Sequence, residues 1–464
     1  MSAGVFIPSS SASPASRADD MRIAEAIGTR ALLWLQSAMW LGLFIIFFCS
    51  PVLQMSDSQY TMLTADSIIH HHTPDLSSYR IKNYRADLPF DIIEGRNAYQ
   101  LARVNGRLLY GFGHGTSILS IPFVAAMEVF GISPAAEGAY DLKGEAMVEK
   151  LLASVLMASL VIIFFYTALL MLDWRWSALV ALGAGLGTSV WSTASRGMWA
   201  HTWEIVLGAI VVFILLESAL RHTSIRPILL ATLLSWMFFV RPDGAIAVLV
   251  VGVYVLVRRP RDVVAFAFAG ALWLVAFVAY SMRFFGTIVP FYYLSNDPHG
   301  LGIHFVQGMY GELLSPSRGI FVFSPVFGVV LYLVARYWRS IADHALAIAA
   351  IAVFAGITVA SAAHPEWWGG MCYGPRLLCD AMPWLILLAI FALAAMPQVS
   401  RSLRSPVLGA GAAMLLLSIA INAYGAFSME TLAWNFKNWP PREAMLNWSH
   451  PQFLAGWVDP PDAR

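Results

Sequence analysis

The chain has 464 residues, of which 58% are hydrophobic and 12% are charged, and its mean hydropathy is +0.66. Soluble domains carry about 25% charged residues, so this composition excludes an ordinary soluble protein and predicts a polytopic membrane protein surrounded by a lipid bilayer. The net charge of +1, with no basic and aromatic-rich patch, gives no reason to expect nucleic acid as a partner.

The first element expected along the chain is a tail. Residues 1–30 precede the first apolar run and are expected to form a disordered cytoplasmic tail, because their first part is rich in Ser, Ala and Pro. The apolar run Ala31–Cys49 has no small-residue cleavage site after it. We therefore interpret it as an uncleaved first span and not as a signal peptide.

Apolar windows of roughly 15 to 24 residues then recur between short polar joints. They predict an all-α polytopic membrane protein with about 11 transmembrane helices, whose bundle occupies residues 31–423. The short pair 227–240 and 244–257 is expected to turn inside the protein. The expected spans are 31–50, 149–172, 176–192, 203–220, 227–240, 244–257, 264–281, 319–335, 344–362, 380–397 and 405–423.

Arginines in the short joints indicate the orientation of the bundle. With a cytoplasmic N-terminus, every inner joint is basic. These joints carry Arg175, then Arg221 and Arg226, then Arg258, Arg259 and Arg261, then Arg336 and Arg339, and finally Arg401 and Arg404. The outer face then receives the long loops, including the first loop at 51–148 and a short C-terminal segment at 424–464. This asymmetry favours chemistry on the outer face.

The first outer loop contains an apolar stretch, residues 116–130, which directly follows Gly113-His114-Gly115 and includes Pro122. Counting it as a crossing would invert the later loops and spoil the basic-inside pattern. We therefore expect an interfacial or re-entrant helix there.

Asp57 is the leading candidate for chemistry. A carboxylate at the membrane boundary costs free energy unless it is paired or hydrated, which favours a functional role. The alternative is that Asp57 caps a helix beginning near Ser58. An acid at the outer end of a first membrane helix, followed by Tyr60 and Ala65, resembles the GT-C glycosyltransferases, such as protein mannosyltransferases and the lipid A aminoarabinose transferase, which keep their catalytic acid there.

Later segments extend this resemblance. Residues 314–325 and 366–376, with Trp434-Asn435 and residues 447–453, are similar to bacterial GT-C-like membrane proteins of unassigned activity. The resemblance implies short helices between the first two spans and an active site on the periplasmic side of a bacterial inner membrane. It also implies that Asp57 acts as a base while a sugar passes, with inversion, from a polyprenyl-phosphate carrier to a lipid-linked glycan, an envelope polymer or a protein.

A second acid near the start of a later span is also implied by the resemblance. Glu204 is its nearest counterpart, and His201 is equally placed to meet a substrate. The alternative for Glu204 is a helix-start residue favoured by the helix dipole.

Three arginines are candidates for the carrier phosphate, because a guanidinium matches phosphate geometry. They are Arg241, Arg318 and Arg376. For Arg241 the alternative is a local pair with Asp243. For the other two it is a headgroup contact or a structural ion pair.

Aromatic and imidazole side chains complete the expected substrate contacts. Trp367 and Trp368 can stack on a sugar or anchor at the membrane interface, and Tyr60 and His114 join His201 as expected substrate-binding residues.

No metal ligand or cofactor is assigned, although a divalent metal ion stays open. The run His70-His71-His72 is a weak metal pattern, because adjacent helical residues cannot all face one ion. Cys372 and Cys379 are close enough in sequence to pair, but unpaired thiols are favoured.

Two other functions compete with the enzyme. They are a transporter or flippase for a lipid-linked sugar and a non-catalytic glycan-binding subunit. The nearly charge-free spans and the lack of an apparent internal repeat favour the enzyme over the transporter.

Overall fold

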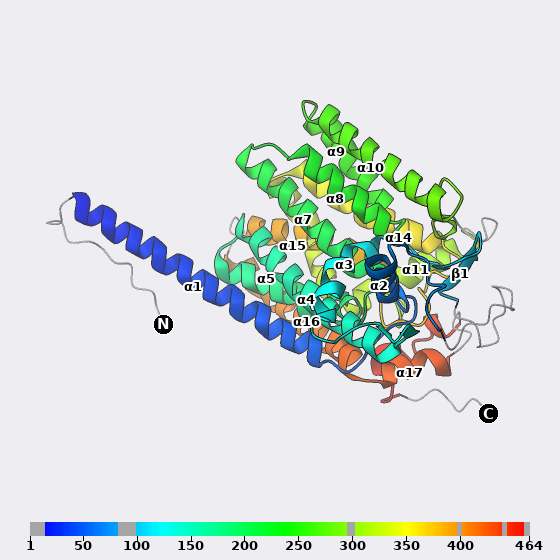
Figure 1. The fold of residues 1–464 in the computed structure, drawn as a ribbon. Coiled ribbons are helices and arrows are strands. Elements are labelled where there is room, and N and C mark those ends of the chain that lie inside the picture. The colour runs from blue at the N-terminus through cyan, green and yellow to red at the C-terminus, as the bar shows by residue number, and fades with distance from the viewer. Residues whose placement is uncertain (1–13, 82–98, 295–301, 397–400, 439–442, 459–464) are drawn as a thin grey trace.

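Apolar helices account for most of the chain in the computed structural model, which describes residues 14–81, 99–294, 302–396, 401–438 and 443–458 (Figure 1). The first half contains α1 (Pro14–Cys49), α2 (Thr61–His71), α3 (Gly115–Glu128), α4 (Leu142–Leu169), α5 (Trp174–Leu186), α6 (Ser189–Ser192), α7 (Ala200–Arg221) and α8 (Pro227–Val240). The second half contains α9 (Gly244–Arg258), α10 (Val263–Phe284), α11 (Phe305–Leu314), α12 (Ile320–Phe323), α13 (Val326–Arg336), α14 (His344–Ala363), α15 (Met382–Ala395), α16 (Arg401–Phe427) and α17 (Glu430–Lys437).

Among the described residues, seven helical segments are long and apolar enough to cross a membrane, which agrees with a helical membrane protein. They are Arg30–Cys49, Leu142–Leu169, Ala200–Arg221, Val263–Phe284, His344–Ala363, Arg376–Ala395 and Pro406–Phe427. The total of about 11 spans stays a prediction, because α5, α8, α9 and α13 have only 13, 14, 15 and 11 residues. The expected span 319–335 is interrupted between α12 and α13 at Ser324-Pro325, where proline has no N–H to donate.

The N-terminal tail differs from the expectation. Helix α1 begins at Pro14, so residues 14–30 are helical and continuous with the first apolar run. Ala and Arg, which favour helices, are frequent in this stretch. The helix projects from the bundle at its N-terminal end (Figure 1). Residues 1–13 of the expected tail lie outside the described residues.

The first loop holds two short helices, as the resemblance implied, together with two small hairpins. Strands β1 (Leu101–Val104) and β2 (Arg107–Tyr110) pair antiparallel across Asn105-Gly106. Both turn residues have positive φ, of 50° and 80°, as a tight two-residue hairpin requires. Strands β3 (Ala135–Ala136) and β4 (Ala139–Tyr140) form the second hairpin. Residues 82–98 of this loop lie outside the described residues.

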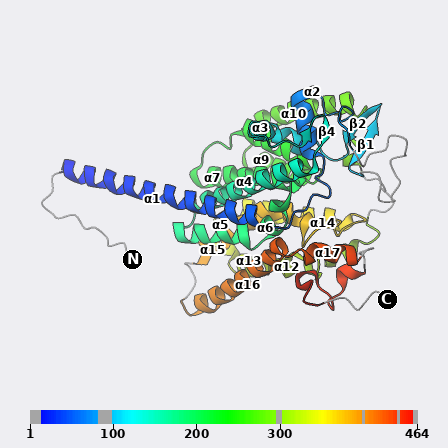
Figure 2. The same cartoon turned by 60° about the horizontal axis from the view of Figure 1, so that its bottom comes forward.

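Helix α4 packs against α1, α5 and α7 and so lies at the centre of the first half of the bundle. Gly185 of α5 faces α4 so closely that a Cβ atom there would lie 2.7 Å from Cγ2 of Val161. Small residues allow membrane helices to approach in this way. Strands β1 and β2 and helix α17 lie at the end of the bundle away from the N-terminal end of α1 (Figures 1 and 2).

Candidate active site

Asp57 lies in a turn between α1 and α2 and makes three polar contacts. The hydroxyl of Tyr99 donates to its Oδ1 at 2.7 Å, and the hydroxyl of Tyr110 donates to its backbone carbonyl at 2.5 Å. Its Oδ2 forms an ion pair with Arg376. Helix α2 begins only at Thr61. Its N-cap residue is Tyr60, and among the described residues no side chain forms a capping hydrogen bond there. The capping alternative for Asp57 is therefore wrong.

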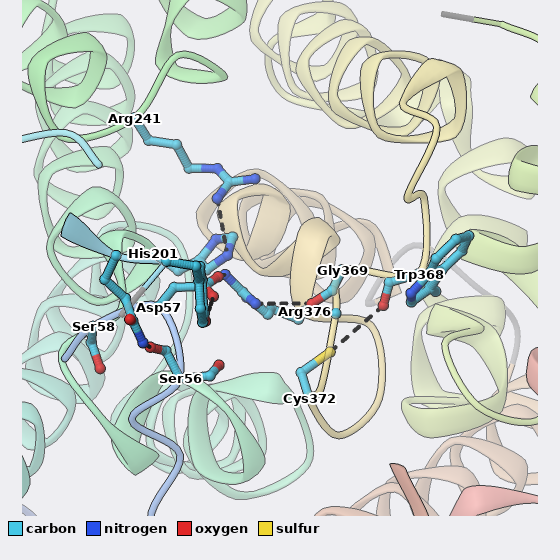
Figure 3. Close-up of polar contacts among 12 residues, drawn as sticks. Ser56, Asp57, Ser58, His201, Arg241, Trp368, Gly369, Cys372 and Arg376 are labelled. Carbon is cyan, nitrogen blue, oxygen red and sulfur yellow. Dashed lines mark hydrogen bonds and ion pairs between the residues drawn. The ribbon is translucent and has the colours of Figure 1, made fainter. Parts of the chain in front are cut away.

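Arg376 is held on three sides (Figure 3). Besides Asp57, its Nη1 donates to the carbonyl of Gly369 at 2.9 Å, and its guanidinium carbon lies 3.7 Å from the centre of the Trp199 ring. A cation stacked on tryptophan is stabilised by the ring quadrupole. Gly369 has φ of 69°, a left-handed conformation that glycine adopts without strain, and it aims its carbonyl at the arginine.

Arg241, between α8 and α9, belongs to a buried charged network. Its Nη1 lies 3.2 Å from Nε2 of His201 (Figure 3). Nδ1 of His201 lies 2.7 Å from Oδ1 of Asp380. A guanidinium can only donate, so Nε2 accepts and Nδ1 carries the proton that is donated to Asp380. Arg241 also contacts Asp243 at 2.6 Å, so the expected local pair is present.

A small polar cavity brings these groups together. Asp57, Arg241 and Arg376, which come from three distant segments, all line it. We call this space the polar cavity; Tyr110, Trp199 and Tyr292 are further parts of its wall. The arrangement offers one carboxylate that can accept a proton and two guanidinium groups that can bind an anion.

A second, apolar cavity of about 160 Å³ lies next to the first, and the two share Phe112 and Gly113 in their walls. We call it the aromatic cavity, and its lining includes Trp236, Phe239, Trp273, Phe277, Tyr280 and Tyr293. Apolar cavities of about 150 Å³ hold small hydrocarbons. This one therefore has room for part of a hydrocarbon chain.

The Gly113-His114-Gly115 motif joins the two cavities because it permits close backbone contact. A Cβ atom at Gly113 would lie 2.7 Å from the carbonyl oxygen of Val240, and one at Gly115 would lie 2.5 Å from the carbonyl of Phe239. Only glycine lets the start of α3 rest on the end of α8, directly before Arg241.

Two glutamates at the start of α4 hold the loops of the site. Oε2 of Glu149 accepts from the Ser58 hydroxyl and from the Met198 amide, both at 2.8 Å. It therefore ties the residue after Asp57 to the residue before Trp199. Oε1 of Glu145, one turn earlier, accepts from amides in the first turn of α2, at 2.8 and 3.4 Å. Both carboxylates are fully buried.

The electrostatics of Asp57 reflect two opposing effects. Burial raises the pKa of its carboxyl, but the Arg376 cation and the Tyr99 hydrogen bond outweigh it, so the pKa lies below the ordinary value of 3.8. Asp57 is therefore ionised and paired when no ligand is bound.

Arg318 does not join the polar cavity. All five of its N–H groups point to protein oxygens, so none is left for a phosphate. The acceptors are the carbonyls of Ser317, Trp368 and Gly370 and the side-chain oxygens of Gln452 and Asn435, at 2.6–3.1 Å. Arg318 thus binds the C-terminal segment to the loop before α15, and these five hydrogen bonds argue against the expected role in phosphate binding.

Four other expected substrate contacts are buried in the protein. Trp367 and Trp368 are 0% and 6% exposed and pack with Trp434, which leaves them available neither for a sugar nor for the membrane interface. Tyr60, 1% exposed, packs on Tyr140. His114 bonds to Tyr280 and Tyr110 through its two ring nitrogens and forms part of the wall of the aromatic cavity.

Glu204 lies in α7, one turn after His201, and is 1% exposed. Its Oε2 has no hydrogen-bond partner among the described residues. It lies beyond the first turn of α7, so the alternative of a dipole-favoured helix-start residue is not supported.

Outside the polar cavity, one cluster among the described residues has the composition of a metal site. Asp66, His70 and Glu128 each offer one ligand atom, and these atoms lie within 4.8 Å of one another. His70 is already bonded to Glu128 at 3.0 Å, and Tyr79 donates to Asp66, so hydrogen bonds account for the cluster without an ion. Cys372 and Cys379 are unpaired buried thiols.

Sequence reasoning missed Trp199, Asp380 and Tyr99. Asp380 immediately precedes an apolar run, as Asp57 follows one, and this shared position was the available signal.

No family model, curated protein or solved structure matches the chain.

Proposed function

We propose that the chain is a GT-C-type glycosyltransferase acting at the periplasmic face of a bacterial inner membrane. It would transfer a sugar from a polyprenyl-phosphate carrier to an envelope glycan, lipid or protein. One observation carries the proposal: the polar cavity, with its carboxylate and two guanidinium groups, adjoins an apolar cavity lined by aromatic rings. A lipid-linked sugar phosphate needs an anion site and a hydrocarbon site side by side.

The proposed reaction is one displacement. The acceptor hydroxyl oxygen attacks the anomeric carbon while the bond from that carbon to the phosphate oxygen breaks. The hydroxyl proton passes to Asp57, and the polyprenyl phosphate leaves with the bonding electron pair. Arg376 and Arg241 would stabilise the charge that develops on the leaving phosphate.

The pairing of Asp57 with Arg376 gives this reaction an activation step. A carboxylate whose pKa is held low by a cation is a weak base. When the carrier phosphate takes over Arg376, Asp57 loses part of that cation's field, and its pKa rises. The donor would thereby strengthen the base that its own transfer requires.

Transfer from radiolabelled polyprenyl-phosphate sugars to envelope extracts tests the proposal with purified wild type, Asp57→Asn and Asp173→Asn. Asp173 is an exposed N-cap of α5, and asparagine caps a helix equally well, so this variant is the matched control. We expect transfer by the wild type and the control and a loss of about 10²–10⁴-fold in Asp57→Asn.

Other outcomes would contradict parts of the proposal. Equal transfer by Asp57→Asn removes Asp57 from the mechanism, and retained anomeric configuration excludes a single displacement. Donor binding without transfer by any form favours a transporter or a binding subunit. Repeating the assay with EDTA determines whether transfer needs a divalent metal ion.

A further inference from the structure

A third cavity lies at the other end of α9 from the polar cavity. It has a volume of about 480 Å³, and His222, Tyr254, Arg258, Arg259 and Asp343 line it. The 15 residues of α9 separate its position from Arg241, which at 1.5 Å per residue amounts to about 22 Å. The cavity is therefore distinct from the candidate active site.

Cationic groups dominate this cavity. Arg258 is exposed, and among the described residues neither Arg258 nor Arg259 has a carboxylate within ion-pair distance. The one acid in the wall, Asp343, accepts from the Leu346 amide and so caps α14. Two permanent positive charges thus face one carboxylate that is already engaged.

Arg259 is oriented before any ligand arrives. Its Nη2 donates to the carbonyl and to the hydroxyl of Ser218, at 2.9 and 2.8 Å. These bonds use both N–H groups of Nη2 and fix the plane of the guanidinium, so a phosphate oxygen would be bound at Nη1. Less side-chain entropy is then lost when an anion binds.

The neighbouring surface of α9 is apolar and exposed. Leu249, Val253 and Leu256 are 69%, 53% and 61% exposed, and their spacing places them in one stripe that continues to Val257, which is 68% exposed and lines the cavity. In a bundle with membrane-spanning helices, such a stripe contacts acyl chains. A soluble anion would use only the cavity, whereas a phospholipid would use the cavity and the stripe together.

We propose that this cavity binds the phosphate headgroup of an anionic phospholipid, with its acyl chains along α9. Basic pockets between helix ends on the cytoplasmic side of membranes bind such headgroups. A free phosphate would bind the same two guanidinium groups. Only a lipid would also contact the exposed stripe, and this contact favours the lipid.

Native mass spectrometry of the full-length protein in detergent tests the proposal. The protein is titrated with phosphatidylglycerol or with phosphatidylcholine of the same acyl chains, with and without inorganic phosphate. We expect preferential retention of phosphatidylglycerol and about fivefold weaker binding in Arg258→Gln, which corresponds to about 1 kcal/mol for one cation near the headgroup.

Arg226→Gln is the matched control. Arg226 is also exposed, and it pairs with Glu217 at 3.5 Å outside the cavity. Arg258 is a surface residue, so its variant should keep the melting temperature of the lipid-free protein. Equal retention of both lipids, or unchanged binding in Arg258→Gln, would overturn the proposal. Full displacement of phosphatidylglycerol by inorganic phosphate would overturn the lipid assignment and indicate a soluble anion.

Discussion

Replacing Arg318 with methionine should mainly lower the stability of the protein, and it should have no direct effect on ligand binding. Hydrogen bonds to a charged group contribute about 1.5–3 kcal/mol each, and Arg318 donates five. Desolvation of the buried guanidinium offsets several kcal/mol of this sum. Leaving the five acceptors without a partner should therefore lower the free energy of unfolding by about 3–5 kcal/mol.

The assay is unfolding of the purified protein by SDS, with a donor-binding measurement on the same samples. Arg226→Met is the control for the substitution itself, since that side chain is exposed, and it should change the free energy of unfolding by less than about 1 kcal/mol. Arg318→Lys should recover little, because an ammonium has three donors and no planar fork. Wild-type stability combined with lost donor binding in Arg318→Met would refute the structural role and restore the phosphate contact.

Three further predictions concern the candidate active site. Because Arg376 depresses the pKa of Asp57 in the free enzyme, kcat/KM for transfer should be independent of Asp57 titration above about pH 5. The stabilisation from the ion pair should likewise persist above the ordinary carboxyl pKa and disappear as the pH falls through the depressed one. In Arg376→Gln the acid limb of the pH–rate profile should move to higher pH, and an unmoved limb would show that the pair does not control Asp57. Glu149→Ala removes the acceptor that two loops of the site share, so it should lower kcat about 10–100-fold. Glu149→Gln should keep kcat near the wild-type value. Equal kcat in the two variants would exclude the positioning role. Gly115→Ala should cost about 1–3 kcal/mol of stability by SDS unfolding, because of its backbone contact with α8. Gly252→Ala, where no atom of the described residues lies within 4 Å of the added Cβ, should be neutral or stabilising, and the same result at both positions would show that the close approach is unimportant.

Much of the helical framework could be predicted, because a bilayer demands apolar runs of a given length and the sequence displays them directly. Helices α7 and α14 start and end within about three residues of the expected spans. The interruption at Ser324-Pro325 was missed because the residues on both sides are apolar. The helical state of residues 14–30 was missed because composition does not reveal a helix that continues from its neighbour.

The candidate site could be predicted only in part. Asp57, Arg241 and Arg376 stood out because a charge next to an apolar run is costly without a role. Arg318 has the same sequence context, and only its distant acceptors, such as Gln452, show that it is saturated. Likewise, Asp380 meets His201 across 179 residues, a separation that no local pattern can report.

The pairing of Asp57 with Arg376 also has a consequence for biosynthesis. The two residues are 319 positions apart in the chain. At about 5–20 residues per second, a ribosome needs roughly 15–65 s to progress from the first to the second. During that interval the turn that contains Asp57 has already been synthesised, but Arg376, which pairs with it, has not. A nascent chain that stops before Arg376 would carry most of its membrane helices and no assembled site, so the site completes only late in synthesis.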